Sequence, residues 1–408
     1  MSHSEADADQ VLTYPIPNDA PLDPPAEWAR LREGCPVARI KLPSGDEAAL
    51  LTRYDDVKQV LADPRFSRRL DAEDAARISA TESGGLFNSE MSATIPQSGA
   101  GHQQWRRLVG KWFTAKRMAA LRPGIEAMAD RLIDEMVASG QPADLKAALG
   151  FPLPVWVICD LLGVPEADRD RFSHWSDSLL NLTRYTEEEV AAAHREFFAY
   201  MAAHVAAKRA EPSDDLLGEL IVATGADGYR MSDKELAATG LGLLLAGHET
   251  TANQIGKMAA MLLGDRRLWE QLLADRSLVR SAVEEALRLD ASGGLGLPRY
   301  IGEDTEIGGV PVGRGTTVMC NMSAANRDER VFDNAAAMEL GRTPNTHLAF
   351  GSGAHACLGQ ALARTELQAV LDVLLRRLPT LRLAVAVEEL PKLEGLMVGG
   401  LREVPVRW

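Results

Sequence analysis

A ten-residue stretch near the C-terminal end, Phe350–Gly359, constrains the fold of this chain more than any other feature. It reads Phe-Gly-Ser-Gly-Ala-His-Ala-Cys-Leu-Gly, so glycines that permit tight turns and close ligand approach precede Cys357. Leucine and valine then recur at helical spacing from Leu362 to Leu375, which predicts a helix opened by the cysteine. Unpaired backbone N–H groups and the helix dipole favour a thiolate at such a position.

Three interpretations of Cys357 follow from these residues alone. A nucleophile needs a base, and His355 is two residues away, but the sequence locates no further member of a triad. A metal ligand suits a flat group such as haem, which can lie against backbone opened by glycine. The third interpretation is a buried cysteine that caps an ordinary helix.

The pattern Phe-Gly-x-Gly-x-His-x-Cys-x-Gly resembles the haem-ligand loop of the cytochrome P450 family, and every position of that pattern is filled here. The resemblance implies that Cys357 is the axial ligand of haem b. It also implies cofactor contacts from other loop residues, namely Phe350, Gly351, His355 and Gly359.

The longest predicted helix covers residues 232–264. Ser232 followed by Glu235 is a capping box, and a helix of about thirty residues runs about 45 Å. Glycine inside a helix costs roughly 1 kcal/mol, yet glycines recur in its middle, and threonines that can bond back to the preceding turn follow them. Residues that disfavour a helix in the middle of a predicted helix indicate a functional site. The alternative is a kinked core helix with buried threonines.

The middle of this helix, Ala246–Thr251, resembles the oxygen-activation segment of the same family. The resemblance implies that Ala246 and Gly247 contact the cofactor and that Glu249 and Thr250 are catalytic residues that deliver protons.

Further residues match family positions. Glu285 and Arg288 match a buried Glu-x-x-Arg pair, with Arg342 as the nearby candidate for its third member. The resemblance implies haem-propionate contacts for four basic residues: His102, Arg106, Arg299 and His347. For His102 and Arg106, which are four residues apart on one predicted helix, two solvated basic side chains are the alternative.

The resemblance runs from Tyr14 to Trp408 and implies a mainly α fold with small β-sheets, the cytochrome P450 fold, with haem between the long central helix and the cysteine loop. We expect a single domain over residues 14–408 after a mobile segment at residues 1–13. Periodicity predicts helices at residues 27–33, 55–62, 102–113, 118–139, 144–162, 166–182, 187–209, 214–223 and 277–289. Strands are predicted at residues 37–42, 48–52, 381–385, 396–398 and 404–406, with a hairpin over residues 307–320.

Composition limits the classes of protein to which this chain can belong. The net charge of −14 argues against a general nucleic-acid binder, which needs a basic surface. The four cysteines are scattered, as expected in a reducing cytoplasm. The polar, acidic N-terminus does not read as a signal peptide, and no run of about 18 apolar residues predicts a membrane span.

The resemblance implies a monooxygenase that inserts one atom of O2 into a C–H bond or an alkene. We expect a bulky, mostly apolar substrate, from secondary metabolism or from xenobiotic or steroid oxidation, because the segment around Gly293, Gly294 and Gly296 lacks side-chain bulk. The predicted substrate wall is Phe87, Met91, Leu243, Leu295, Leu297, Leu396, Met397 and Val398. Residues 172–184 form either a roof for this pocket or ordinary core.

No flavin or nicotinamide fingerprint is present, so a ferredoxin with its reductase is the expected electron donor to a monomeric enzyme. The basic residues Arg107, Lys111, Lys116 and Arg364 are candidate ferredoxin contacts, or simply solvated charges. Two alternatives to hydroxylation or epoxidation stay open: a haem-thiolate binding or sensing protein without turnover, and a P450 that catalyses oxidative coupling or desaturation.

Overall fold

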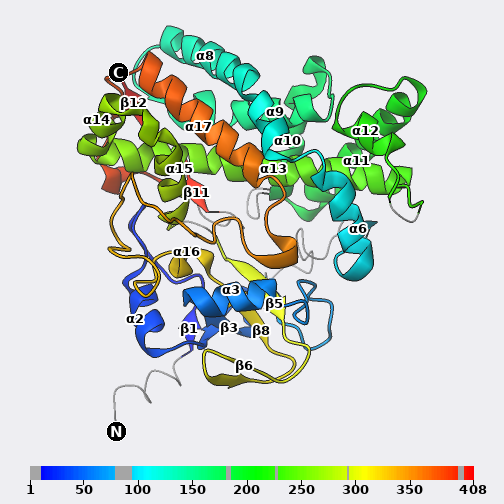
Figure 1. The fold of residues 1–408 in the computed structure, drawn as a ribbon, viewed down its shortest axis with the longest axis vertical. Coiled ribbons are helices and arrows are strands. Elements are labelled where there is room, and N and C mark those ends of the chain that lie inside the picture. Colours follow the sequence, from blue (N-terminus) through cyan, green and yellow to red (C-terminus); the bar gives the residue numbers. More distant parts are fainter. Residues whose placement is uncertain (1–10, 79–93, 181–184, 226–227, 292–293, 394–398) are drawn as a thin grey trace. The chain divides into compact units, whose positions relative to one another are not determined.

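The computed structural model describes residues 11–78, 94–180, 185–225, 228–291, 294–393 and 399–408. These residues form two compact units (Figure 1). Unit 1 comprises the described residues of Met1–Ala93 and Arg280–Cys357, and unit 2 those of Thr94–Val279 and Leu358–Trp408. Neither unit contains, among these residues, a helix with the length and apolar character needed to cross a membrane.

Unit 1 is built on a five-stranded sheet with the order β1-β2-β3-β8-β5. Its strands are β1 (Leu12–Thr13), β2 (Ala38–Lys41), β3 (Glu47–Leu51), β8 (Thr317–Cys320) and β5 (Leu297–Tyr300). The strands predicted at residues 37–42 and 48–52 are confirmed as β2 and β3, which pair antiparallel, and β8 joins β3 in parallel and β5 antiparallel. A separate antiparallel pair consists of β6 (Thr305–Ile307) and β7 (Val310–Val312).

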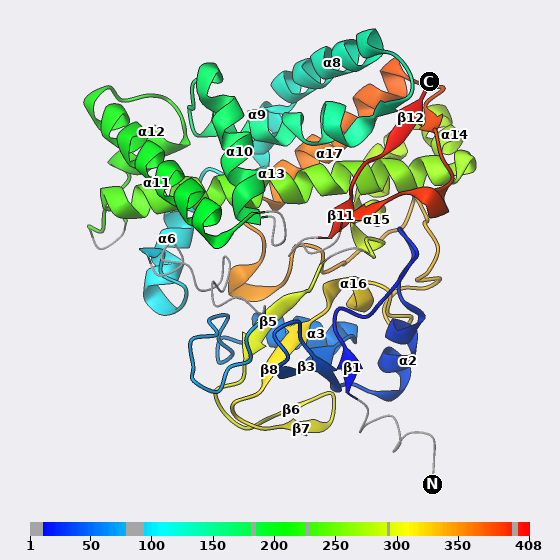
Figure 2. The same ribbon diagram turned by 180° about the vertical axis from the view of Figure 1, so that it is seen from behind.

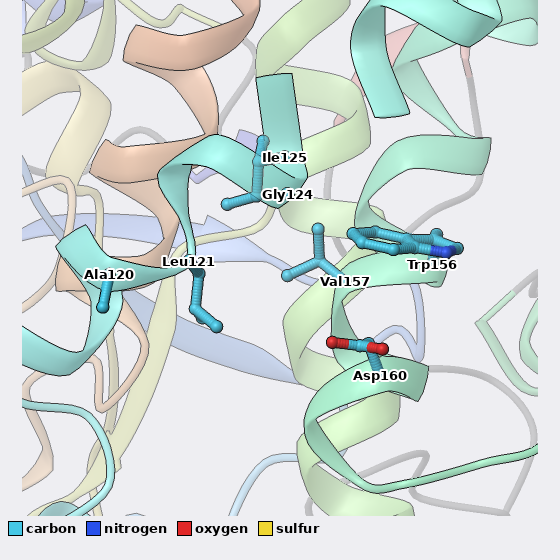
Figure 3. A pocket seen from close by; sticks show the side chains of 7 residues that line it. All are labelled: Ala120, Leu121, Gly124, Ile125, Trp156, Val157 and Asp160. Carbon is cyan, nitrogen blue, oxygen red and sulfur yellow. The ribbon is translucent and has the colours of Figure 1, made fainter. Parts of the chain in front are cut away.

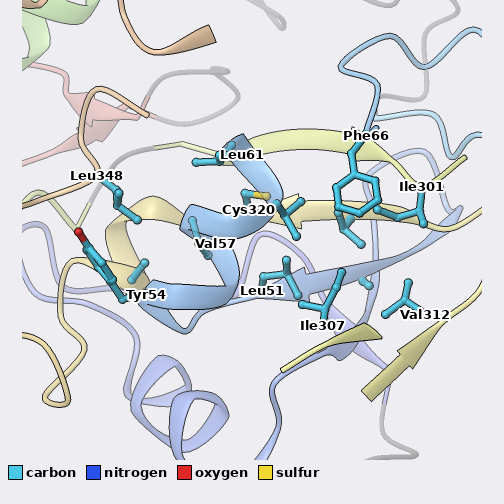
Figure 4. Packing of buried hydrophobic residues seen from close by; sticks show 14 of the residues in the cluster. Leu51, Tyr54, Val57, Leu61, Phe66, Ile301, Ile307, Val312, Cys320 and Leu348 are labelled. Atoms are coloured by element: carbon cyan, nitrogen blue, oxygen red, sulfur yellow. The ribbon is translucent and has the colours of Figure 1, made fainter. Parts of the chain in front are cut away.

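Unit 1 also contains helices, of which α3 (Tyr54–Ala62) packs on this sheet through an apolar core. The others are α2 (Ala26–Gly34), α15 (Val279–Arg288), which begins at the unit boundary, and α16 (Met322–Ala325). Tyr54, Val57 and Leu61 of α3 pack against β3, β8 and the segments around Phe66 and Ile301 (Figure 4). Val57 is fully buried, as expected for the apolar face of an amphipathic helix.

Unit 2 is mainly helical. Its helices are α6 (Gly99–Gly110), α7 (Ala115–Ala120), α8 (Arg122–Ser139), α9 (Pro152–Leu161), α10 (Arg169–Leu180), α11 (Glu187–Ala210), α12 (Leu216–Val222), α13 (Asp233–Gly264), α14 (Arg266–Ala274) and α17 (Gln360–Arg377). Shorter turns are the π-helix η1 (Lys146–Gly150) and the 3-10 helices η2 (Glu166–Asp168), η3 (Arg276–Leu278) and η5 (Val387–Glu389). The long helix α13 packs against α9, α11 and α17, and α17 lies beside α8 (Figure 1, Figure 2).

The predicted capping box starts α13: the Ser232 hydroxyl accepts from the Glu235 N–H, and the Glu235 carboxylate accepts from the Ser232 N–H. Glycines inside the helix allow its neighbours to approach. A Cβ added at Gly240 would lie 2.2 Å from the Met201 methyl of α11, and one at Gly247 would lie 3.3 Å from Ile158 of α9. The helical cost of these glycines is therefore offset by close packing.

Small sheets complete unit 2. One has the order β4-β12-β9, with β4 (Ala143–Asp144), β12 (Pro405–Arg407) and β9 (Arg382–Leu383). The other pairs β10 (Lys392–Leu393) with β11 (Gly400–Leu401). The predicted strand at residues 396–398 lies outside the described residues.

Several predicted elements differ from the structure. The single helix expected over residues 118–139 is two helices, with α8 starting afresh at Arg122 because Pro123 occupies its first turn. The helix expected over residues 144–162 is a short strand, the π-helix η1, and α9, which Pro152 opens. Helix α14 was not predicted. The hairpin predicted over residues 307–320 ends at Val312, since β8 pairs with β3 and β5.

The core interpretation of residues 172–184 holds for the aromatic side chains that the structure describes. Phe172 and Trp175 of α10 are 0% and 1% exposed and contact Phe197 and Tyr200 of α11. Leu182 lies outside the described residues.

Candidate cofactor and catalytic site

The cysteine loop of unit 1 is closed by a backbone hydrogen bond, from the N–H of Cys357 to the carbonyl of Phe350 at 2.7 Å. Gly351 and Gly353 have φ values of +70° and +73°, which L side chains rarely adopt. A Cβ on Gly353 would also lie 2.5 Å from the Ala62 Cα. Cys357 is exposed, so its thiol is not a buried helix cap. The cysteine precedes α17 by three residues and does not open the helix itself, because the turn through Gly359 comes first.

Arg299 on β5 is a buried cation in unit 1. The residue is 3% exposed, and burial lowers the pKa of its guanidinium. Its Nη1 donates to the carbonyl of Pro298 at 2.8 Å, and no carboxylate among the described residues pairs with it. A buried cation without a paired anion is costly, so this position is suited to an anionic ligand group.

His347 has partners of its own within unit 1. Its Nδ1 accepts the N–H of Ala349 at 3.2 Å, which places the ring proton on Nε2. Nε2 then donates to Glu284 Oε2 at 3.0 Å. Since both ring nitrogens are engaged, the geometry lends no support to the propionate contact predicted for His347. His355 is half-buried on the 3-10 turn η4 (Gly353–His355).

The predicted Glu285–Arg288 pair is a buried network in unit 1. Both side chains are fully buried, and Arg288 donates to the two carboxylate oxygens at 2.8 and 2.7 Å. The prediction of Arg342 as third member is confirmed, because its Nε donates to the same carboxylate. Arg288 also donates to the carbonyl of Ala337 at 3.0 Å.

Helix α6 of unit 2 carries the predicted pair His102 and Arg106. It begins at Gly99, three residues earlier than predicted, since the Gly-Ala-Gly segment is already helical. His102 is 5% exposed and stacks on Trp105, so it is not a solvated side chain. Arg106 is half-buried. The Trp105 Nε1 donates to Thr239 Oγ1 at 2.9 Å, which fixes α6 to α13.

The central part of α13 exposes one face although most of the helix is buried. Ala246 and Thr250, one turn apart, are exposed, and Leu243 and Gly247 on the same face are half-buried. Thr250 Oγ1 donates to the Ala246 carbonyl at 3.0 Å, and Thr251 makes the same kind of bond to Gly247 at 3.4 Å. The predicted hydrogen bonds from threonine hydroxyls to carbonyls of the preceding turn are therefore confirmed, and the helix continues past them.

His248 is a buried residue of α13 for which sequence reasoning assigned no role. Its Nδ1 lies 3.0 Å from the Leu244 carbonyl and 3.3 Å from Ser176 Oγ on α10. A carbonyl only accepts, so Nδ1 carries a proton. Burial lowers the pKa of His248 to about 4. The residue links α10 to α13 and does not act as a charged group near neutral pH.

The predicted substrate wall is only partly described. Phe87, Met91, Leu396, Met397 and Val398 lie outside the described residues. Leu295 is 9% exposed and packs in a core cluster of unit 1 with Tyr14 and Met319, which argues against its place on an open wall. Leu297 is half-buried against the core cluster shown in Figure 4.

A cavity of about 170 Å³ lies in unit 2 between the start of α8, the end of α7, and α9 (Figure 3). Trp156, Val157 and Asp160 line one side and Leu121 and Ile125 the other. None of the predicted site residues lines it, so this cavity is not the predicted substrate pocket.

Comparison with known proteins adds independent findings. The profile of the family described as Cytochrome P450 matches residues 257–398. The chain is 42% identical to the mycinamicin IV hydroxylase/epoxidase of Micromonospora griseorubida over 398 residues, covering 97% of this chain and 98% of the relative. It is 40% identical to the nocardicin C N-oxygenase of Nocardia uniformis subsp. tsuyamanensis over 399 residues, with 97% and 98% coverage.

Solved structures give the same result. The mixed-function P450 MycG superposes with a TM-score of 0.89 at 40% identity, covering 98% of this chain and all of that one. The LnmA cytochrome P450 hydroxylase of Streptomyces atroolivaceus, from the leinamycin biosynthetic pathway, gives 0.88 at 40% identity with the same coverage. The predicted fold class is therefore confirmed.

Proposed function

Since this chain belongs to the cytochrome P450 family and is a haem-thiolate monooxygenase, we propose that it uses haem b, ligated by Cys357, to oxidise a bulky, mostly apolar small molecule of secondary metabolism. The reaction proposed is insertion of one atom of O2 into a C–H bond or an alkene. The other oxygen atom leaves as water, which requires two electrons and two protons.

The residues of unit 1 fit the group that the family implies. The loop that ends at Cys357 presents an exposed thiol behind two glycines with positive φ, a geometry open to a flat ligand. Arg299 supplies a buried cation for a carboxylate such as a haem propionate. These observations support Cys357 as axial ligand and Arg299 as a propionate contact.

The residues of unit 2 fit the same group. Ala246 and Gly247 place a small-residue surface on the exposed face of α13, where a flat ring system can approach. We assign His102 and Arg106 of α6 to the propionates on the strength of the family pattern. Haem with a thiolate ligand supplies the oxidising chemistry when bound, and protein groups supply position and protons.

Glu249 and Thr250 are proposed to move those protons. Thr250 Oγ1 is exposed and donates to a carbonyl of its own helix, so rotation about χ1 frees the hydroxyl to donate elsewhere. Glu249 is half-buried on the adjacent position and can return a proton to that hydroxyl. A protein that only binds or senses haem has no need for this acid–alcohol pair.

The substrate class is supported by the relatives. One of them is named for the hydroxylation and epoxidation of mycinamicin IV, and the structure of LnmA belongs to a biosynthetic pathway. Leu243 contributes an apolar side chain on the exposed face of α13. We propose a macrolide, polyketide or steroid-like skeleton as the class to be screened first.

Electrons must come from a partner protein, as is usual for bacterial members of the family. We propose a ferredoxin with its reductase. Arg107, Lys111 and Lys116 are exposed and Arg364 is half-buried, all within unit 2, and they give an acidic partner cations to contact. A monomer and a cytoplasmic location stay predictions from the sequence.

The deciding experiment is the spectrum of the reduced carbon monoxide complex. Thiolate ligation by Cys357 gives a Soret band shifted far to the red, and Cys357→His should move that band to the position of imidazole-ligated haem and remove oxidation activity. Cys35→Ser is the matched control, because Cys35 is a buried thiol in the core of unit 1. Retention of the red-shifted band in Cys357→His would exclude Cys357 as ligand.

Substrate size is tested by a library screened for the spectral shift that accompanies ligand binding. The proposal expects large apolar compounds to bind more tightly than monocyclic ones. If small monocyclic compounds bind tightest, the proposed substrate class is wrong while the haem-thiolate assignment stands.

A further inference from the structure

Helix α6 carries two of the proposed propionate contacts, His102 and Arg106, but it makes little close backbone contact with the other described elements of unit 2. Its first turn lies against the preceding loop, because a Cβ added at Gly101 would lie 3.1 Å from the Pro96 Cβ. Beyond that turn, individual side-chain contacts must fix the direction in which the residues of α6 point.

Trp105 provides such a contact, from α6 to α13. Its Nε1 donates to Thr239 Oγ1 at 2.9 Å, the usual length of a good N–H···O hydrogen bond. The indole is half-buried, and a buried indole N–H usually finds an acceptor. The bond therefore selects the orientation of the Trp105 ring that places Nε1 against α13.

Thr239 is an unusual residue for its position in α13. It is 0% exposed in the interior of the helix, where threonine is a poorer helix former than alanine or leucine. A buried hydroxyl also costs free energy unless it is hydrogen-bonded. The bond from Trp105 gives this hydroxyl in the core a physical role.

The other contact of Trp105 is with His102, one turn earlier on the same helix. The two rings stack with their centroids 6.1 Å apart and an angle of 26° between their planes. His102 is 5% exposed, so the indole forms part of the surroundings that hold the imidazole. Direct contacts therefore run from Thr239 of α13 through Trp105 to His102.

We propose that Trp105 is a positioning residue for the haem propionate that His102 contacts. The indole, held by Thr239, fixes the orientation of the His102 imidazole and with it the hydrogen-bond donor that is offered to the propionate. The inference rests on the proposed function, in which His102 binds a propionate. Hydrogen bonding around a haem also tunes its reduction potential, so Trp105 influences that potential through His102.

The first test measures haem release from the holoenzyme and needs no turnover. Trp105→Phe keeps a ring beside His102 and removes the N–H, and Thr239→Val keeps the shape of the side chain and removes the acceptor. Each variant should release ferric haem to excess apomyoglobin about fivefold faster than wild type, the factor expected for one lost hydrogen bond. Thr239→Ser keeps the hydroxyl and should behave as wild type. Unchanged haem release in both Trp105→Phe and Thr239→Val would overturn the inference.

Two further measurements separate positioning from a merely structural role. The resonance Raman bending band of the propionates reports their hydrogen bonding and should shift in Trp105→Phe and Thr239→Val. The reduction potential should fall, because a propionate that is less strongly hydrogen-bonded places more negative charge near the iron.

Trp269→Phe is the matched control for these measurements. Trp269 is fully buried on α14, and its Nε1 donates to the Pro379 carbonyl at 2.9 Å, so the substitution removes the same kind of hydrogen bond away from α6. It should lower stability to chemical denaturation while haem release, the Raman band and the potential keep their wild-type values. Equal changes in Trp269→Phe and Trp105→Phe would show a general loss of stability and would contradict the inference.

A double variant distinguishes failure of the inference from failure of the proposed propionate contact. His102→Phe keeps a ring beside Trp105 and removes both ring nitrogens, so it should release haem faster than wild type. In that background Trp105→Phe should cause no further change in the propionate band or the potential. The same change in both backgrounds would show that Trp105 acts independently of His102, and the inference alone would fail.

The single variant His102→Phe tests the contact itself. If it leaves haem release and the propionate band unchanged, His102 does not bind a propionate, and the inference fails together with that part of the proposed function. The carbon monoxide band, recorded for every variant, shows that thiolate ligation is intact.

Discussion

Arg342 Nε donates to both carboxylate oxygens of Glu285, at 3.0 and 3.2 Å, across 57 positions of the chain. Glu285 also accepts two hydrogen bonds from Arg288 and one from the N–H of Glu339. Burial alone would raise the pKa of Glu285, but these donors outweigh it and hold the pKa below its usual range. The carboxylate is therefore an ionised centre that joins α15 to the segment before the cysteine loop.

Arg342→Met should destabilise the protein by about 3 kcal/mol, since it removes one partner from a buried ionic network. Chemical denaturation measures this loss. Arg376→Met is the control, because Arg376 pairs with Asp130 at the surface and is 54% exposed, so that change should cost less than about 1 kcal/mol. Equal losses in the two variants would contradict the structural role given to Arg342.

The same network predicts a pH dependence. The folded-state pKa of Glu285 lies below its unfolded value, so its contribution to stability is complete above the unfolded pKa, for which 4.5 is the reference value. It is lost as the pH falls through the folded pKa. The stability difference between wild type and Arg342→Met should therefore be constant between pH 6 and 8 and shrink below about pH 4.

The cysteine loop allows two matched glycine substitutions. Gly351 and Gly353 both have positive φ, so alanine at either site costs about 1–2 kcal/mol of backbone strain. At Gly351 the nearest atom to a new Cβ is 3.9 Å away, whereas at Gly353 the Ala62 Cα is 2.5 Å away. Gly353→Ala should therefore lose clearly more stability and more bound haem than Gly351→Ala. Indistinguishable haem content and unfolding midpoints would show that contact with α3 does not shape the loop.

The parts of this protein that were predictable from sequence are those whose structure depends on interactions between residues close together in the chain. Ser232 and Glu235 cap α13 as their spacing requires, and Thr250 bonds back to Ala246 as a helical threonine can. The Phe350–Cys357 segment was predictable as a loop because its glycines permit positive φ values that other residues rarely adopt. The arginine that completes the Glu285 network was found because it has few candidates nearby in the chain.

What was not predictable depends on distant packing. Nothing in the sequence marks the close packing of η1 on α13, where a Cβ on Gly150 would lie 3.3 Å from the carbonyl oxygen of Ala252. Leu295 was assigned to an open wall from its glycine-rich neighbours, but it packs with Tyr14, which is 281 positions away and donates to the Leu295 carbonyl at 2.8 Å. For an apolar residue among glycines, the sequence does not show against which part of the core its side chain packs.

Thr250→Ala tests the proton role directly. Thr250 is exposed and its hydroxyl donates to a carbonyl of its own helix, so alanine should preserve stability and haem content, with a small gain in helix propensity. Reductant consumption should continue while product falls and hydrogen peroxide rises. Thr251→Ala removes the neighbouring hydroxyl, which bonds back to Gly247, and should keep product and reductant coupled. Tight coupling in Thr250→Ala would refute the role given to Thr250.

Glu366 on α17 is a buried acid of unit 2 that the proposed chemistry does not use. It is 1% exposed, its Oε2 has no hydrogen-bond partner among the described residues, and burial raises its pKa well above the usual range. Burial therefore makes the folded protein hold the Glu366 proton more strongly than the unfolded chain does. Because the folded state binds more protons, this residue lowers stability as the pH rises above the reference value of 4.5.

Glu366→Gln should remove that pH dependence, because an amide of the same shape stays neutral in both states. At pH 4 the two proteins should have similar stability. As the pH rises above 4.5, the variant should become progressively more stable than wild type, with a slope of at most about 1.4 kcal/mol per pH unit, until the pH passes the folded-state pKa of Glu366. Glu135→Gln, a substitution at an exposed position of α8, is the control. A stability difference for Glu366→Gln that does not change with pH would mean that the Glu366 carboxylate is ionised in the folded protein, held by a partner or by water.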